Sequence, residues 1–175
     1  LIDRAITPAM NEVSDRWRRQ EYFIPEVMRS ASTMQAGMDA LKPHIVKDAS
    51  SETGVRVALG TVQGDLHDIG KNLVAIMLQG VGCDVDNMGV DLPPERFVEA
   101  VQSGVRVLGM SSLLTTSMQG MQTVIDMLKE SGLRDNVAIL VGGAPVTAEF
   151  AAKIGADHYA ADAAGAVEIM NRHFI

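Results

Sequence analysis

From residue 54 to the end of the chain, short apolar segments alternate with longer segments that have the spacing of amphipathic helices. The expected strands are 55–62, 84–89, 105–110, 137–141 and 158–160. The expected helices are 71–79, 94–103, 117–131, 147–154 and 162–173. Strands that alternate with helices form a parallel sheet with right-handed crossovers. The alternation therefore predicts an α/β fold with a five-stranded parallel sheet in the flavodoxin-like, Rossmann-type order.

The first 46 residues have helical spacing only. Met10, Val13 and Trp17 share one helical face, and a second helix is expected from Pro25 to about Pro43. Its expected apolar stripe consists of Val27, Met28, Ala31, Met34, Met38 and Leu41. We therefore expect a small helical-bundle cap over residues 1–46, truncated because the chain starts in mid-helix pattern. The polar segment 47–53 is the expected linker to a domain over residues 54–175.

Composition excludes several classes of protein. The net charge is −7 and no cluster of Lys and Arg relieves it, which argues against a nucleic-acid binder. The one cysteine, Cys83, rules out a disulfide framework and a CxxC metal site, and we expect it to be a small buried residue. No apolar run has the length of a membrane span and no signal peptide is visible, so we expect a cytoplasmic protein.

In doubly wound sheets, ligands bind beyond the carboxyl ends of the strands, and Asp65 and His67 follow the first expected strand there. An imidazole is a good metal ligand when a carboxylate orients its other nitrogen. The remaining histidines, His44, His158 and His173, are scattered, so a zinc site is not expected. A lone histidine suits a metal that a macrocycle already holds. The alternative is that His67 is a surface residue that caps a helix.

Two further loops lie at the same edge of the sheet. The loop after the third strand is rich in hydroxyl groups, which either cap the next helix or line a polar slot, with one of them holding Asp65. Gly142 and Gly143 follow the fourth strand, where they form either a tight turn or a close approach to a ligand. The hydroxyl residues are Ser111, Ser112, Thr115, Thr116 and Ser117.

The three loops together resemble the cobalamin-binding domain of methionine synthase and of corrinoid methyltransferase proteins. The resemblance rests on Asp-x-His-x-x-Gly, Ser-x-Leu and Gly-Gly at successive strand ends, and on the run GTVQGDLHDIGKN over residues 60–72. It extends to the cap, where NEVSDRW and YFIPEVM are similar to the helices that precede that domain. The implied cofactor is cobalamin, as methylcobalamin or a related corrinoid with its cobalt.

The resemblance also implies residue roles. His67 is the lower axial ligand of cobalt in the base-off, His-on mode, Asp65 bonds its other nitrogen, and Ser117 bonds Asp65. Trp17 and Ile24 cover the upper face of the corrin. The remaining cofactor-binding residues belong to the His67 loop or line the slot for the nucleotide tail, and they are Leu66, Asp68, Ile69, Gly70, Ser111, Leu113, Thr115, Gly142, Gly143 and Ala163.

The implied function is a methyl carrier whose cobalt alternates between Co(I) and methyl-Co(III). The expected partners are a substrate:corrinoid methyltransferase, a methyl-acceptor methyltransferase such as a folate-dependent one, and a reductive activator. The chain alone is then a non-catalytic subunit, and residues 47–53 are the hinge on which the cap moves. The alternatives are an adenosylcobalamin mutase domain, which typically has Arg in place of Ile69, a light sensor, a fragment of methionine synthase, or a cofactor-free flavodoxin-like signalling module.

Overall fold

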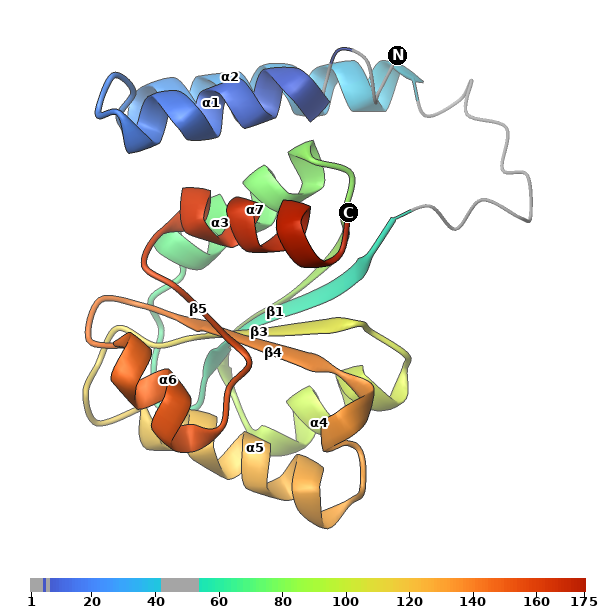
Figure 1. Ribbon diagram of the computed structural model, residues 1–175, viewed down its shortest axis with the longest axis vertical. Helices are drawn as coiled ribbons and strands as arrows, with labels where there is room; N and C mark the ends of the chain where they lie inside the picture. The colour runs from blue at the N-terminus through green and yellow to red at the C-terminus, as the bar shows by residue number, and fades with distance from the viewer. Residues whose placement is uncertain (1–4, 6, 42–53) are drawn as a thin grey trace.

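The computed structural model describes residue 5 and residues 7–41 and 54–175. Its centre is a five-stranded sheet whose pairings are all parallel, in the order β2-β1-β3-β4-β5 (Figure 1). The prediction of a flavodoxin-like sheet is therefore confirmed. The strands are β1 (Arg56–Val62), β2 (Asp84–Leu92), β3 (Val107–Ser111), β4 (Ala138–Gly142) and β5 (His158–Ala160).

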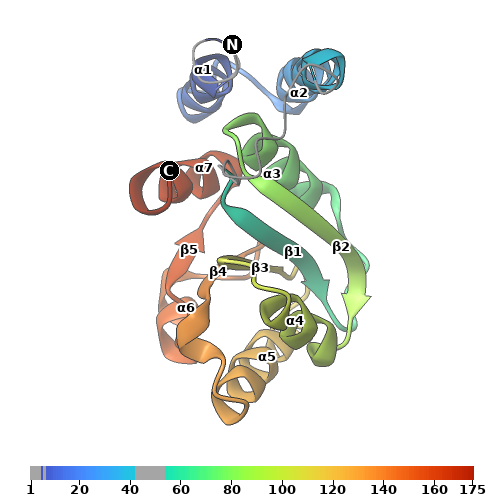
Figure 2. The same cartoon turned by 90° about the vertical axis from the view of Figure 1, so that its right-hand side faces the viewer.

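Helices cover both faces of this sheet, and each face has its own apolar core. Helices α3 and α7 lie on one face, and α4, α5 and α6 lie on the other (Figures 1 and 2). Burial on both faces explains why β1 is apolar along nearly its whole length, with only Arg56 exposed. The helices are α3 (Ile69–Gly80), α4 (Pro94–Gln102), α5 (Gln119–Glu130), α6 (Ala148–Ile154) and α7 (Ala163–His173), with a short 3₁₀ helix η3 (Arg134–Asn136).

The expected cap consists of α1 (Thr7–Arg18) and α2 (Ile24–Leu41), which lie above α3 and α7 (Figure 2). Met10 and Met34 are buried against α3, where a Cβ at Gly80 would stand 2.5 Å from Met10 and 2.8 Å from Met34. Met28 was expected in the buried stripe of α2 but is 45% exposed, because the buried face runs through Val27, Ala31 and Met34 instead. The predicted linker 47–53 lies outside the described residues.

Two element boundaries differ from the sequence prediction in ways that concern the strand ends. Strand β2 continues past Gly89 to Leu92, and α5 begins at Gln119 rather than at Ser117.

Cys83 is buried as expected, and burial raises the pKa of its thiol to about 12. In the ranges that the structure describes, every helix is too short or too polar to cross a bilayer.

Candidate functional site

A cavity of about 650 Å³ opens at the carboxyl ends of β1, β3 and β4, between the sheet, α3, α7 and the cap. Most of its wall is apolar, and twelve of the predicted site residues contribute to it. They are Trp17, Ile24, Leu66, His67, Asp68, Ile69, Gly70, Ser111, Leu113, Gly142, Gly143 and Ala163. The cavity therefore lies where the topological rule places ligands, at the carboxyl edge of the sheet.

The imidazole of His67 lies at the mouth of this cavity, with its side chain 53% exposed. Its Nδ1 is 2.7 Å from Oδ1 of Asp65, and its main-chain N–H donates to the same oxygen at 3.0 Å. Thr61, at the end of β1, donates its hydroxyl to the main-chain oxygen of His67 at 2.9 Å. The ring is thus held from one side, which leaves Nε2 without a protein partner among the contacts of the described residues.

The other oxygen of Asp65 is bound by the loop after β3. Leu113 and Leu114 donate their main-chain N–H groups to Oδ2 at 2.6 and 3.2 Å, and Ser117 donates its hydroxyl at 3.2 Å. Ser112 stands 2.8 Å from Ser117, oxygen to oxygen. Ser117 does not cap α5: the N-cap position is Met118, no side chain caps it, and the helix starts two residues later than predicted.

Asp65 is a fully buried carboxylate. Burial alone would raise its pKa, but the main-chain N–H of His67 and then those of the β3 loop, together with the His67 imidazole, hold the pKa well below its usual range. The group is therefore an anion at neutral pH. A proton shared between this anion and an imidazole resides on Nδ1, so Nε2 keeps its lone pair for a metal.

Apolar side chains surround the exposed imidazole. Leu66 is 72% exposed and Ile69 is 74% exposed, and Leu113 is the third large apolar residue beside them. Large apolar side chains gathered around one polar group mark a binding surface for an apolar partner. If a corrin binds here, His67 would hold its metal, and Leu66, Ile69 and Leu113 would contact its apolar ring.

The glycines at the cavity differ in what they accommodate. A Cβ at Gly143, whose φ is +127°, would collide with the carbonyl oxygen of Ser112, and one at Gly142 would stand 2.9 Å from the oxygen of Ala160. The protein itself therefore requires those two glycines. A Cβ at Gly70 would meet nothing within 4 Å, although Gly70 is helical and lines the cavity. Since glycine disfavours a helix, the space at Gly70 fits a bound group rather than a protein neighbour.

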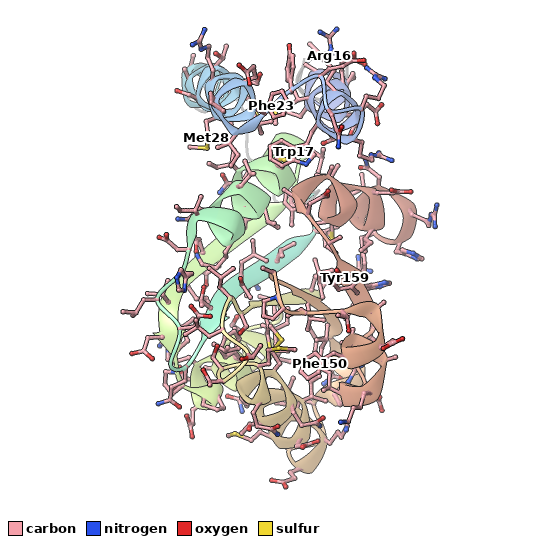
Figure 3. The ribbon with its side chains drawn as sticks, turned by 90° about the vertical axis from the view of Figure 1, so that its left-hand side faces the viewer. Arg16, Trp17, Phe23, Met28, Phe150 and Tyr159 are labelled. Carbon is pink, nitrogen blue, oxygen red and sulfur yellow. The ribbon has the colours of Figure 1, made fainter. Side chains whose placement is uncertain are left out.

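Three predicted site residues lie outside the cavity wall. Asp65 and Ser117 stand behind His67, as their predicted roles require. Thr115 was expected to line the slot, but it is exposed and does not contribute to the wall. The loop turns its main-chain N–H groups toward Asp65 at Leu113 and Leu114, and the next side chain consequently points to solvent. Trp17 projects from α1 toward α3 and α7 (Figure 3) and, with Ile24, reaches the cap side of the cavity.

Several residues of the site were not predicted. Lys71 is buried beside the cavity, and its ammonium donates to the side-chain oxygens of Asn72 (3.0 Å) and Asn87. Asn72 in turn donates to the Asp68 carboxylate at 2.9 Å. Burial lowers the pKa of Lys71, against the attraction of Asp68. The only sequence signal was the position of Lys71 and Asn72 directly after the His67 loop.

The described residues contain no group of three or more His, Cys, Asp or Glu side chains that could hold a metal ion. A metal at His67 would therefore take its other ligands from outside these groups, and a macrocycle, which the sequence suggested, is one such source.

Comparisons with known proteins identify the family of the chain. The B12 binding domain family matches residues 55–168, and a second family of the same description matches residues 1–42. The dimethylamine corrinoid protein of Methanosarcina barkeri is 47% identical over 169 residues, which are 95% of this chain and 79% of that protein.

Two solved structures share the fold. A cobalamin-binding protein from Desulfitobacterium hafniense DCB-2 has a TM-score of 0.80 and 35% identity, over 93% of this chain and 77% of that one. A chain of the methanol:cobalamin methyltransferase complex from Methanosarcina barkeri has a TM-score of 0.86 and 33% identity, over 98% of this chain and 66% of that one. The cofactor is therefore cobalamin, and the alternative of a cofactor-free signalling module is wrong. The chain belongs to the B12-binding family, among the corrinoid proteins of methyltransferase systems.

Proposed function

We propose that this chain is the methyl-carrier subunit of a cobalamin-dependent methyltransferase system, with His67 as the lower axial ligand of cobalt. One observation carries the proposal: Nδ1 of His67 is bound to the buried carboxylate of Asp65 at 2.7 Å, at the mouth of the cavity. When bound, the cobalamin supplies a cobalt centre that accepts a methyl group from one partner and passes it to another. The chain's own residues bind, orient and shield that centre.

Asp65 and Ser117 act on the ligand rather than on the substrate. The Asp65 anion keeps a proton on Nδ1 of His67, and Ser117 shares the charge of that anion through its hydroxyl at 3.2 Å. A stronger hydrogen bond to Nδ1 makes Nε2 a better donor to a metal. The position of this one proton therefore sets how readily Nε2 binds and releases the cobalt.

The apolar slot between the sheet and α7 is suited to the nucleotide tail that His67 displaces. Gly70 leaves space along the cavity wall, Ala163 adds only a small side chain to it, and the wall offers few polar groups that would have to be desolvated. Trp17 and Ile24 approach from the cap and would exclude water from the upper face of the corrin. Methyl exchange then requires the cap, which we propose spans residues 1–46, to move on the segment 47–53.

The methyl donor is chosen by a partner protein, because the cavity described above is taken up by the cofactor. The relatives at 40–48% identity are named mainly as dimethylamine corrinoid proteins. We propose that the donor partner is a methyltransferase for methylated amines. A second methyltransferase, with a folate or a comparable carrier as acceptor, and a reductive activator complete the proposed system.

Reconstitution tests the proposal directly. The purified chain, mixed with methylcobalamin and passed through a desalting column, should retain stoichiometric corrinoid with the absorption spectrum of the base-off, His-on form. His67→Ala should shift that spectrum to the base-off form without a histidine, whereas His173→Ala, on the exposed end of α7, should leave it unchanged. A folded chain that elutes colourless would overturn the proposal.

The proposed amine partner has its own test. Reduced, corrinoid-loaded protein should be methylated from dimethylamine only when an amine methyltransferase is added, as followed by the absorption of the corrinoid. Methylation with a methanol methyltransferase instead would keep the methyl-carrier function and reject the donor class.

A further inference from the structure

Strand β2 carries two irregularities where it runs along β1. Leu59 pairs with Asn87, but the next residue, Gly60, pairs with Gly89, and Val62 pairs with Leu92. Each of these two steps leaves one extra residue on β2, which is the arrangement of a β-bulge. Bulges redirect the chain and are frequent beside functional sites. The second bulge lies at residues 90–91, next to the loop that carries His67.

Asp91, at this second bulge, has a φ of +53°. Among the non-glycine residues that the structure describes, Gln20 alone shares a positive φ. A residue with a side chain is held in this left-handed region at a cost of about 1 kcal/mol, somewhat less for Asp and Asn. Such a conformation persists where surrounding contacts enforce it, so the contacts of Asp91 indicate what the conformation is for.

Outside the strand ladder, Asp91 makes two hydrogen bonds to described residues, and both fall on the turn directly before His67. Its main-chain N–H donates to the carbonyl oxygen of Asp65 at 3.0 Å, and its Oδ1 accepts from the N–H of Gly64 at 2.7 Å. The left-handed conformation of Asp91 occurs together with these two contacts. Main chain and side chain of one residue thus hold both ends of the Gly64–Asp65 segment.

The His67 loop depends on such contacts because it is not held by burial. Gln63, Gly64, Leu66 and His67 are exposed, and Asp65 is the one residue between β1 and Asp68 that is buried. The Asp65 carboxylate reaches its donors from the β3 loop only if its own main chain is fixed. Strand β2 supplies that fixed point from the opposite side, through Asp91.

We propose that Asp91 is a positioning residue for the cobalt ligand: it clamps the Gly64–Asp65 turn so that Asp65 orients His67 toward the cavity. The role of His67 in this statement rests on the proposed function above. The clamp itself is a property of the chain without its cofactor, and it can be measured there.

Three substitutions separate the two parts of the clamp. Asp91→Gly keeps the left-handed conformation and removes the acceptor, and Asp91→Ala removes the acceptor and disfavours the conformation. Asp91→Asn keeps an acceptor oxygen and tolerates the conformation, and it serves as the conservative rescue. Asp86→Ala, at an exposed position of the same strand, is the matched control for loss of one carboxylate.

Amide hydrogen exchange in the cofactor-free protein is the first measurement. The His67 N–H donates to Asp65 and does not touch Asp91, so its protection reports whether the clamp acts through the turn. Asp91→Gly should accelerate its exchange roughly tenfold and Asp91→Ala more, while Asp91→Asn and Asp86→Ala stay within about twofold of the wild type. If the His67 N–H of Asp91→Gly also exchanges within about twofold of the wild-type rate, the proposed clamp is refuted.

The second measurement is the electron paramagnetic resonance of the Co(II) form, as the ratio of histidine-bound to histidine-free cobalt. Asp91→Gly should lower this ratio roughly tenfold, and Asp91→Asn should restore it. A purely structural role would lower the melting temperature and leave the ratio unchanged, which would reject the positioning role. A wild type without histidine coupling, combined with faster exchange in Asp91→Gly, would instead reject the proposed function and retain the clamp.

Discussion

Replacing Asp65 by Asn perturbs the site without changing its size. The carboxylate accepts five hydrogen bonds, of which Oδ1 takes two from His67 and Oδ2 takes three from the β3 loop. An amide has one acceptor oxygen and one donor nitrogen. The nitrogen should take the Oδ1 position, since it meets fewer donors there and the imidazole can adapt. The adaptation is a tautomer change, in which Nδ1 accepts from the amide and Nε2 carries the proton.

The magnitude follows from these contacts. The three hydrogen bonds at Oδ2 lose the charge of their acceptor, which weakens each by about 1 kcal/mol. The main-chain N–H of His67 loses its acceptor, which destabilises the folded protein by about 1–3 kcal/mol. Relief from burying a charge offsets part of this loss. We expect Asp65→Asn to lower the free energy of unfolding of the cofactor-free protein by about 2–4 kcal/mol.

Urea unfolding at pH 7 measures this loss, with Asp86→Asn as a control that removes a similar charge from an exposed site. The tautomer change adds a second expectation: the Asp65→Asn variant, loaded with Co(II) corrinoid, should show no coupling to a histidine nitrogen. Wild-type stability together with undiminished histidine coupling would refute the reasoning, because it would mean that the Asp65 charge neither stabilises the loop nor sets the tautomer of His67.

Three further predictions concern the same molecule. Gly70→Ala should stabilise the cofactor-free protein by about 0.5–1 kcal/mol and weaken corrinoid binding at least roughly tenfold. Gly143→Ala should instead destabilise the protein by more than about 1 kcal/mol. Thermal unfolding measures the two changes in stability, and corrinoid titration measures the change in binding. The depressed pKa of Asp65 contributes stability that is fully present above about pH 4, where an Asp in the unfolded chain is ionised, and that is lost as the pH falls toward the folded pKa. The difference in free energy of unfolding between wild type and Asp65→Asn should therefore narrow below about pH 4. Cys83, with its pKa raised to about 12, should resist alkylation at pH 8 in the native protein and react in urea; rapid native labelling would contradict its burial.

The sequence was most informative where the signal was local. Each strand and helix of residues 54–175 has its own periodicity, so the sheet could be predicted. The contact between Asp65 and His67 could also be predicted, because two residues of separation on a loop bring the side chains together. The contact of Asp65 with Ser117 joins different strand ends. The hydroxyl-rich loop predicted that one of its hydroxyls holds Asp65, but the choice of Ser117 came from the resemblance to cobalamin-binding domains.

The remaining features of the site have no comparable signal. The donors of Leu113 and Leu114 are main-chain N–H groups, which every non-proline residue carries. The bulge at Asp91 depends on a backbone conformation that hydropathy does not encode, and the end of β2 was consequently placed too early. Thr115 was assigned to the slot by its place in a motif, whereas the direction of a loop side chain is set by tertiary contacts.

The central claim, that His67 binds the cobalt, is tested most directly by isotopic labelling of histidine nitrogen. The Co(II) form of the corrinoid-loaded protein should show a nitrogen triplet in its electron paramagnetic resonance spectrum, and ¹⁵N-histidine should convert the triplet to a doublet. His67→Ala should abolish the coupling to histidine, while His173→Ala should keep it. A triplet that persists with ¹⁵N-histidine would show that the cofactor keeps its own base, and would contradict the account.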